Sequence, residues 1–280
     1  MKIGVDLGGT NIRVGLIEGD SVVVKNVAPC PSDRPAGEVL DSLGNLISGI
    51  FSPEVRGIGI GVPSAVDVDK GIVYDVCNIP SWKEVHLKDY LENRFGIPAF
   101  INNDANCFAL GEARFGSCRD FRDVVGITLG TGVGMGIIIN GQLYNGVNAS
   151  AGEMSAIPYL DSDYEHYCSS TFFTRCHGLS GKEASVLAGE GDERALQIWN
   201  EFGLHLGKFI TAVMFAYAPE SITFGGSIAA AFPFFENSMR AELQNYPYHA
   251  TLGKLRICRA GGGDTAILGA SALVDSNIRQ

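Results

Sequence analysis

Residues 3–17, IGVDLGGTNIRVGLI, carry the strongest fold signal in the chain. An apolar run, residues 3–5, leads through Asp6 into two glycines and Thr10, and a second apolar run follows at residues 12–17. Apolar runs bounded by glycines are typical of strands, so the pattern predicts a hairpin with a tight turn. Its glycines would let backbone N–H groups approach an anion. The segment matches neither the GxGxxG nucleotide fingerprint nor a P-loop.

A similar segment, GITLGTGVGMGIIIN, occupies residues 126–140. When Gly4 is aligned with Gly126, the turn glycine Gly8 falls on Gly130. Two hairpins of this kind predict a duplicated domain, with a nucleotide held in the cleft between the halves.

The composition describes a globular α/β protein of two domains, with 280 residues, 46% hydrophobic content and 36 glycines. A net charge of −10 argues against nucleic acid, since phosphate neutralisation needs clustered Lys and Arg. No apolar run approaches the roughly 20 residues that span a bilayer. Because the chain enters a strand at once, we expect no signal peptide, no membrane partner and a cytoplasmic location.

The seven cysteines form no CxxC pair, which favours reduced thiols. One local cluster combines His166, Cys168, Cys176 and His177. These are zinc-ligand types at an unusual spacing. The alternative is a helix with small buried thiols, and the sequence leaves open whether the cluster binds anything.

Hydrophobic periodicity and turn signals predict the remaining elements. Residues 192–217 form the clearest helix, with apolar residues at spacings of three and four. The other predicted helices span 37–51, 87–95, 165–175 and 266–274. A helix is also predicted after residues 103–106, through roughly Arg114, and another after Ser227, with a polar insert at 178–181. The other predicted strands span 21–27, 57–62, 66–74 as a hairpin, 99–102, 221–224 and 255–259.

The strand at 99–102 ends in Asn103 and Asp104. Strand ends of open α/β sheets are frequent sites of chemistry. The alternative is that Asp104 only caps the helix that follows, since Asp is a favoured N-cap residue. Two phosphate-binding hairpins elsewhere in the chain favour the catalytic interpretation.

The strand at 221–224 runs into Gly225 and Gly226. A corner without side chains allows flat contact with a base or ribose. Taken alone, it is equally an ordinary tight turn between a strand and a helix.

In this order, the elements resemble the ROK family of sugar kinases and sugar-responsive repressors, within the actin/hexokinase/Hsp70 superfamily. The resemblance covers almost the whole chain. The matching segments are DLGGTNIR (6–13), GIGIGVPSAVD (57–67), CNIPSWKEV (77–85), INNDANCFALGEARFG (101–116), LGTGVGMGI (129–137), AGE (151–153), ITFGGSI (222–228) and AGGGDTAILGAS (260–271). The resemblance implies an α/β fold of two ribonuclease-H-like (actin-like ATPase) domains with mixed sheets flanked by helices around a central cleft. The expected division is 1–105 with 265–280 against 106–264.

The resemblance also implies roles for individual residues. Asp104 would be the general base. The implied sugar-binding residues are Ser64, Asn78, Asn103, Asp104, Glu153 and Glu165. The implied nucleotide-binding residues are Asp6, Gly8, Gly9, Thr10, Asn11, Gly130, Thr131, Gly132, Gly225 and Gly226, with Asp6 positioning Mg²⁺ indirectly and the last two glycines bordering the adenine of ATP.

Three departures from the family pattern stand out. The histidine of the GExGH motif, which in the family touches the sugar and ligates zinc, is replaced by Ala156. The CxCGxxGCLE zinc loop is missing, although Glu165 and Ser169 fit the end of that motif, so structural zinc is not expected. Ser64-Ala65 stands where the family usually has glycine.

The predicted function is that of an ATP-dependent hexokinase acting on the 6-hydroxyl of a glucose-like hexose. The resemblance also implies a homodimer. Mannose, fructose, allose and the N-acetylated amino sugars, N-acetylmannosamine and N-acetylglucosamine, remain open as substrates. A repressor of the same family is disfavoured because no helix-turn-helix segment precedes the first hairpin. A non-catalytic sugar sensor is the third alternative.

Overall fold

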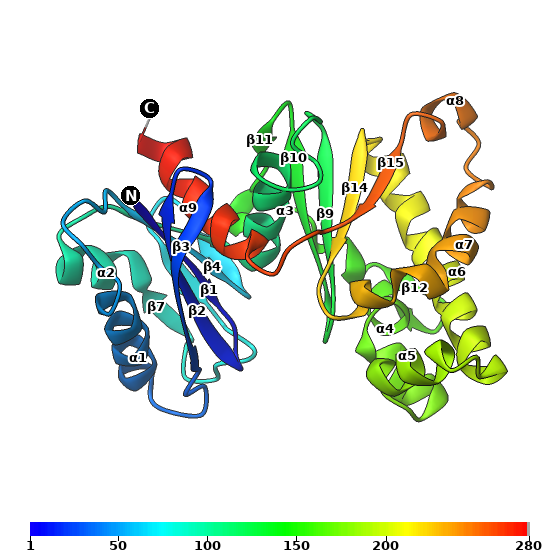
Figure 1. Ribbon diagram of the computed structural model, residues 1–280, viewed down its shortest axis with the longest axis horizontal. Helices are drawn as coiled ribbons and strands as arrows, with labels where there is room; N and C mark the ends of the chain where they lie inside the picture. The colour runs from blue at the N-terminus through cyan, green and yellow to red at the C-terminus, as the bar shows by residue number, and fades with distance from the viewer. Residues whose placement is uncertain (279–280) are drawn as a thin grey trace. The chain divides into compact units, whose positions relative to one another are not determined.

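The structure, a computed structural model, describes residues 1–278 and separates into two compact units (Figure 1). Unit 1 comprises Met1–Arg122, Gly136–Ala151 and the described part of Gly261–Gln280, and unit 2 comprises Asp123–Met135 and Gly152–Ala260. The division differs from the predicted one because α3 (Asp104–Arg114) stays with unit 1, where it packs against the C-terminal helix α9 (Thr265–Ile278).

Unit 1 is built on a mixed five-stranded sheet in the order β3-β2-β1-β4-β8. The strands are β1 (Lys2–Leu7), β2 (Asn11–Glu18), β3 (Ser21–Pro29), β4 (Ile58–Val62) and β8 (Ala99–Asn103). The first three strands form an antiparallel meander, while β4 pairs in parallel with both β1 and β8. The hairpin predicted from residues 3–17 is therefore confirmed.

Side chains alternate across β1 and β4, so each strand serves two faces of the sheet. Ile3, Val5 and the isoleucines of β4 enter a core shared with α1 (Ala36–Ser48). On the other face, glycines admit α9 at backbone contact. A Cβ at Gly4 would lie 2.0 Å from the carbonyl oxygen of Ile267, and one at Gly59 would lie 1.8 Å from that of Ala270. Gly4 and Gly59 thus leave room for the C-terminal helix.

A three-stranded sheet of β5, β6 and β7 and the helix α2 complete the first part of unit 1. Their bounds are β5 (Ala65–Asp67), β6 (Ile72–Tyr74), β7 (Glu84–His86) and α2 (Leu87–Phe95). The antiparallel hairpin of β5 and β6 has Ser64 directly before it in the chain and the loop with Asn78 after it.

The second five-stranded sheet has the order β11-β10-β9-β14-β15, and the division between the units falls within β10. Its strands are β9 (Val124–Leu129), β10 (Val133–Ile139), β11 (Gln142–Leu143), β14 (Ser221–Gly225) and β15 (Arg256–Arg259). In unit 2, β14 pairs in parallel with both β9 and β15.

The helices of unit 2 pack through an aromatic core. Trp199 and Phe202 on α6 (Glu193–Tyr217) pack against Phe173 and against Phe235 on α7 (Phe232–Leu243), and all four are fully buried. The remaining elements are η1 (Val147–Ala149, in unit 1), η2 (Glu153–Ala156), β12 (Pro158–Tyr159), β13 (Ser162–Asp163), α4 (Tyr164–Cys168), η3 (Phe172–Cys176), α5 (Gly181–Gly189), α6 (Glu193–Tyr217), η4 (Ile228–Ala231), α7 (Phe232–Leu243) and α8 (His249–Leu252).

One predicted feature of unit 2 is wrong, and one helix was not predicted. The helix expected at 165–175 is interrupted, because α4 ends where Ser169 adopts an extended backbone and a π-helical turn, η3, follows. The predicted polar insert at 178–181 leads into α5, which was not predicted and begins with a capping box between Ser180 and Glu183. That signal was readable in the sequence as Ser-x-x-Glu.

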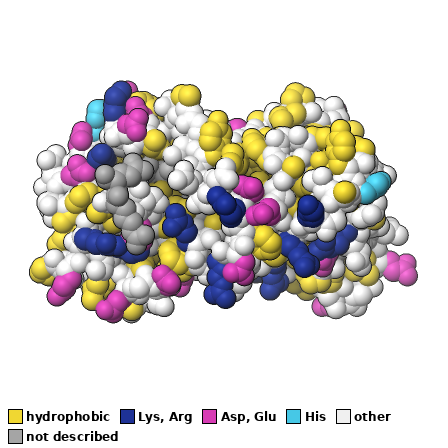
Figure 2. Space-filling model, turned by 90° about the horizontal axis from the view of Figure 1, so that it is seen from above, with side chains coloured by type: hydrophobic (Ala, Val, Ile, Leu, Met, Phe, Trp, Pro, Cys, Tyr) yellow, Lys and Arg dark blue, Asp and Glu magenta, His cyan; other side chains and the backbone are white. Residues whose placement is uncertain are grey.

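Basic side chains lie among acidic ones on the face drawn in Figure 2, rather than in one basic area. Binding to nucleic-acid phosphates requires clustered positive charge, which this face does not present. Within residues 1–278, every helix is too short or too polar to cross a membrane.

Candidate functional site

The turn of the first hairpin is fixed by backbone hydrogen bonds within unit 1. The N–H of Gly8 donates to the carbonyl of Asn11 at 3.0 Å, and the carbonyl of Thr10 accepts from the N–H of Cys30 at 2.9 Å. The second bond ties the turn to the segment that follows β3. The turn is therefore held in one shape before any ligand binds.

Asp6 lies at the base of this turn, opposite Arg13 in the strand register. The residue is 8% exposed, and its carboxylate lies 2.7 Å from the Arg13 guanidinium. Burial raises the pKa of Asp6, and the Arg13 charge opposes part of the rise. A protein holds Mg²⁺ through one or two carboxylates together with substrate phosphates and water, so a single buried carboxylate beside the turn fits such an ion.

The loop that carries Asn78 packs directly on the turn. A Cβ at Gly9 would lie 2.4 Å from the Cβ of Asn78 and 3.0 Å from its carbonyl oxygen. Only glycine therefore fits at this position. In unit 1, an expected sugar-binding residue and the expected phosphate-binding turn are in contact.

The junction of β8 and α3 shows which residue caps the helix. The side-chain oxygen of Asn103 accepts the N–H groups of Ala105 and Asn106 at 2.8 and 3.2 Å, so Asn103 is the N-cap. Asp104 is the first residue of the helix, is half-buried, and accepts the N–H of Ala105 at 2.8 Å. The alternative that Asp104 is the N-cap is wrong.

Ser64 and Asn103 are joined across the ends of neighbouring strands. The Asn103 amide nitrogen lies 3.4 Å from the Ser64 carbonyl oxygen, and the Ser64 hydroxyl donates to the carbonyl of Tyr74. The Asn103 oxygen is committed to the helix cap. Its contribution to a sugar would therefore come from the amide nitrogen.

The sheet brings the two aspartates near each other, because Asp6 pairs with Gly61 and a Cβ at Gly61 would lie 3.3 Å from the Cα of Asp104. The pKa of Cys107 is raised well above its ordinary value, first by burial, then by the charge of Asp104 and then by that of Asp6. The structure thus brings Asp6, Asp104, Asn103, Ser64 and Asn78 together within unit 1.

The turn of the second hairpin lies in unit 2 and is held in a similar way. The N–H of Gly130 donates to the carbonyl of Gly132 at 3.0 Å, and the Gly130 carbonyl accepts the N–H of Ser170 at 2.8 Å. Thr131, between the two glycines, is exposed. This turn also has a fixed shape.

Glu165 contacts this turn. Its carboxylate accepts the N–H of Val133 at 3.0 Å, and a Cβ at Gly132 would lie 2.6 Å from its Oε2 atom. The side chain of Asp163 caps α4 by accepting the N–H of His166 at 2.7 Å, which sets the start of the helix that carries Glu165.

Glu153 begins η2 in the same unit. The preceding Gly152 has φ +105°, and a Cβ there would lie 2.0 Å from the carbonyl oxygen of Met135. The Glu153 side chain is exposed, yet desolvation raises its pKa, and the Glu165 charge adds to the rise. The Glu165 carboxylate therefore acts on that of Glu153. Ala156 ends η2 with its side chain exposed.

The two glycines after β14 lie beside the same turn. Gly225 pairs with Thr128 in the sheet, and Gly226 has φ +84°. A Cβ at Gly226 would lie 2.3 Å from the carbonyl oxygen of Leu129. Unit 2 thus gathers Gly130–132, Gly225, Gly226, Glu153 and Glu165.

The histidine and cysteine cluster does not converge on one point. Cys176 Sγ lies 3.8 Å from His166 Nε2, but Cys168 is fully buried, and His177 instead faces Glu201 at 3.5 Å. Across residues 1–278, there is no group of three His, Cys, Asp or Glu side chains placed to hold a metal ion.

Two contributors were not predicted. Arg13 is the charge partner of Asp6, and pairing the hairpin about its turn would have placed them opposite each other. Asn102 accepts the N–H of Asn103 at 2.8 Å and the side-chain amide of Asn106 at 3.0 Å. Only the folded strand-to-helix junction brings those groups together.

Comparisons with known proteins agree over the length of the chain. The model of the ROK family matches residues 2–277. The glucokinase of Thermotoga maritima is 29% identical over 99% of this chain and 98% of its own. The xylose repressor of Bacillus subtilis is 30% identical over 78% of this chain and 60% of its own.

A solved structure shows the same fold. The ROK family glucokinase of Streptomyces griseus, in complex with glucose and AMPPNP, has a TM-score of 0.83 and 26% sequence identity, and the match covers 99% of both chains. The predicted class, an actin-like ATPase fold with mixed sheets flanked by helices, is confirmed. This chain belongs to the ROK family.

Proposed function

We propose that this protein is an ATP-dependent sugar kinase that transfers the γ-phosphate of Mg-ATP to a hydroxyl group of a hexose. The observation that carries the proposal is the placement of Asp104. Asp104 follows the Asn103 cap as the half-buried first residue of α3, and it lies beside Gly61, the sheet partner of Asp6. Membership of a family with glucokinases supports the reaction class.

Asp104 would act as the general base. A sugar hydroxyl has a pKa far above neutral, so a base within hydrogen-bond reach is needed as the oxygen attacks phosphorus. The Asn103 amide nitrogen and the Ser64 backbone, linked at 3.4 Å, would orient that hydroxyl. Asn78 would add a further polar contact from its loop.

The glycine turns would hold the phosphates. Backbone N–H groups of residues 8–11 and 130–132 would face the transferring group, where fixed donors contribute most to stabilising developing charge. Magnesium, when bound with ATP, supplies neutralisation of the phosphate charge. Asp6 would orient it through water, and Gly225 and Gly226 would leave room for the adenine.

Glu153 and Glu165 would bind sugar hydroxyls as carboxylates. Because Glu165 also touches Gly132, a sugar bound to Glu165 would be held in a fixed position relative to the phosphate-binding turn. Ala156 stands where the family pattern has a sugar-contacting histidine, so the hydrogen bond from that histidine to the sugar is lost.

We propose the 6-hydroxyl of a glucose-like hexose as the acceptor. The alternative substrates are N-acetylmannosamine, N-acetylglucosamine, fructose and allose. They remain open because alanine at position 156, in place of the histidine, leaves more room beside the sugar. We further propose a homodimer, which light scattering of the purified protein would establish.

A coupled ADP-release assay with a panel of hexoses tests the proposal. The wild type should turn over at least one hexose, and Asp104→Asn should lose about 10²–10⁴-fold in kcat. Nucleotide binding should persist, as measured by fluorescence of a labelled ATP analogue. An Asp104→Asn variant with near wild-type turnover would show that another group is the base.

A second candidate, a non-catalytic sugar sensor, is favoured by the 30% identity to a xylose repressor. It predicts sugar binding by calorimetry without ADP release for any hexose in the panel. Measurable turnover with any hexose excludes it.

A further inference from the structure

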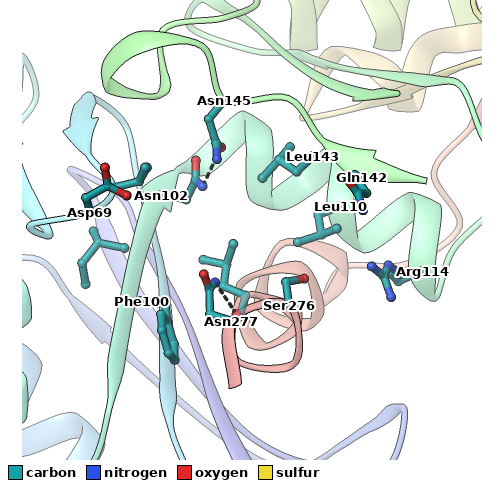
Figure 3. A pocket seen from close by; sticks show the side chains of 13 residues that line it. Asp69, Phe100, Asn102, Leu110, Arg114, Gln142, Leu143, Asn145, Ser276 and Asn277 are labelled. Atoms are coloured by element: carbon teal, nitrogen blue, oxygen red, sulfur yellow. Dashed lines mark hydrogen bonds between the residues drawn. The ribbon is translucent and has the colours of Figure 1, made fainter. Parts of the chain in front are cut away.

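A cavity of about 320 Å³ lies within unit 1, outside the residues assigned to transfer. Its walls come from β8, α3, β11 and the end of α9 (Figure 3). Ligand pockets occupy about 300–1,000 Å³, so this one suits a small molecule.

The polar groups of the cavity are distributed along its length. Figure 3 shows Arg114 and Gln142 toward one end, and Asn102, Asn145 and Asp69 toward the other. Within residues 1–278, Arg114 and Gln142 have no side-chain hydrogen bond or ion pair. The positive end of the cavity is therefore available to a ligand.

The opposite end is a built polar wall. Asn102 is 3% exposed, and its side-chain amide donates to the Asn145 side-chain oxygen at 2.9 Å. The Asn145 amide nitrogen and the Asp69 carboxylate complete that end. Such groups exchange hydrogen bonds with hydroxyls.

We propose that this cavity binds a small hydroxylated anion, with its phosphate or carboxylate on Arg114 and its hydroxyls toward Asn145 and Asp69. A guanidinium pairs with either anion through charge-assisted hydrogen bonds. The volume, at the lower end of the range for ligand pockets, accommodates a three- or four-carbon acid or phosphate.

A ligand in the cavity would change the hydrogen bonding of Asn103. The side chain of Asn102 bridges the cavity residue Asn145 and the backbone N–H of Asn103, the N-cap of α3. A ligand that pulls on Asn145 therefore acts on the residue that precedes Asp104. We expect the ligand to change the apparent KM for hexose, a consequence that rests on the proposed function.

Calorimetric titration with glycerol 3-phosphate, without ATP or sugar, tests the site directly. D-glycerate tests the carboxylate source, while glycerol and inorganic phosphate lack one of the two required features. Arg114→Gln should weaken binding about 10- to 100-fold, the usual loss for hydrogen bonds to a charged group. Ser276→Met, which fills the cavity from its rim, should also weaken it. Arg119→Gln, an exposed arginine that does not line the cavity, is the matched control.

The outcomes separate the two parts of the inference. Equal affinity in wild type and Arg114→Gln, or no binding of either organic anion at 10 mM (about the weakest affinity of interest), overturns the site. Binding that depends on Arg114 but leaves the hexose KM unchanged supports the site and overturns the link through Asn102. Because the titration needs no turnover, it stands even if the kinase assignment fails.

Discussion

The carboxylate of Glu165 accepts a hydrogen bond from the Val133 N–H at 3.0 Å, and a Cβ added at Gly132 would lie 2.6 Å from its Oε2 atom. An expected sugar-binding residue and an expected phosphate-binding turn therefore share one contact. Unit 1 shows a corresponding contact between Asn78 and Gly9. In each unit, the turn glycine leaves room for the neighbouring side chain.

Gly132→Ala should leave the protein folded but displace Glu165. The atom it meets is the end of a flexible side chain, which can move away at little cost in stability. We expect the hydrogen bond to Val133 to be lost and the KM for hexose to rise, with the melting temperature nearly unchanged. Gly189→Ala, at an open position in the same unit, is the control. An unchanged KM would separate Glu165 from sugar binding.

Gly226→Ala should instead destabilise unit 2. Its Cβ would meet the backbone of Leu129 at 2.3 Å, and φ +84° strains any other residue. Overpacking of this kind typically costs about 1–3 kcal/mol. Urea unfolding should show the loss relative to Gly189→Ala, and equal stability of the two variants would contradict the geometry.

Asp6→Asn should remove an electrostatic cost to folding. Because burial raises the pKa of Asp6 above its ordinary 3.8, the folded protein binds this proton more tightly than the unfolded chain. The wild type therefore loses stability relative to Asp6→Asn as the pH rises from below 3.8 through the raised pKa. Magnesium-dependent turnover should fall more than sugar affinity.

Unfolding measured from pH 3 to pH 7 would show this difference. Asp67→Asn provides a control of opposite sign, because a hydrogen bond from the Lys70 N–H lowers the pKa of Asp67 below its ordinary value. A stability difference between wild type and Asp6→Asn that shrinks with rising pH would mean that the Arg13 pair outweighs burial.

Glu165→Gln should lower the pKa of Glu153. Desolvation and the Glu165 charge both raise the Glu153 pKa above 4.5, and the substitution removes the second cause while keeping an oxygen for Val133. Hexose affinity in the wild type should decline as the pH falls through the raised pKa, since the protonated acid accepts fewer hydrogen bonds.

Carbon-13 titration of the glutamate carboxyl groups measures this shift. Glu193→Gln, on the exposed first turn of α6, should leave the Glu153 titration unchanged. A Glu153 pKa that is the same in all three proteins would place the two carboxylates too far apart to interact.

Much of the fold is readable in the sequence where the pattern is long or punctuated. The α6 helix was predicted to within one residue of its start, since Asp192 is its N-cap and Pro219 follows its end. The interruption at Ser169 was not readable, because it lies beside a contact between distant segments, in which the N–H of Ser170 donates to the carbonyl of Gly130. The same limit applied to the domain boundary, which depends on the contact of α3 with α9.

The sequence by itself determined the two glycine hairpins, the strand end that delivers Asn103 and Asp104, and membership of the family, since these rest on local spacing and residue type. Only the tertiary structure decided that Asn103 caps α3, that Arg13 forms an ion pair with Asp6, and that Glu165 contacts Gly132. The physical reason is that charge pairing, burial and close contact depend on distances between segments, and local sequence patterns do not specify those distances.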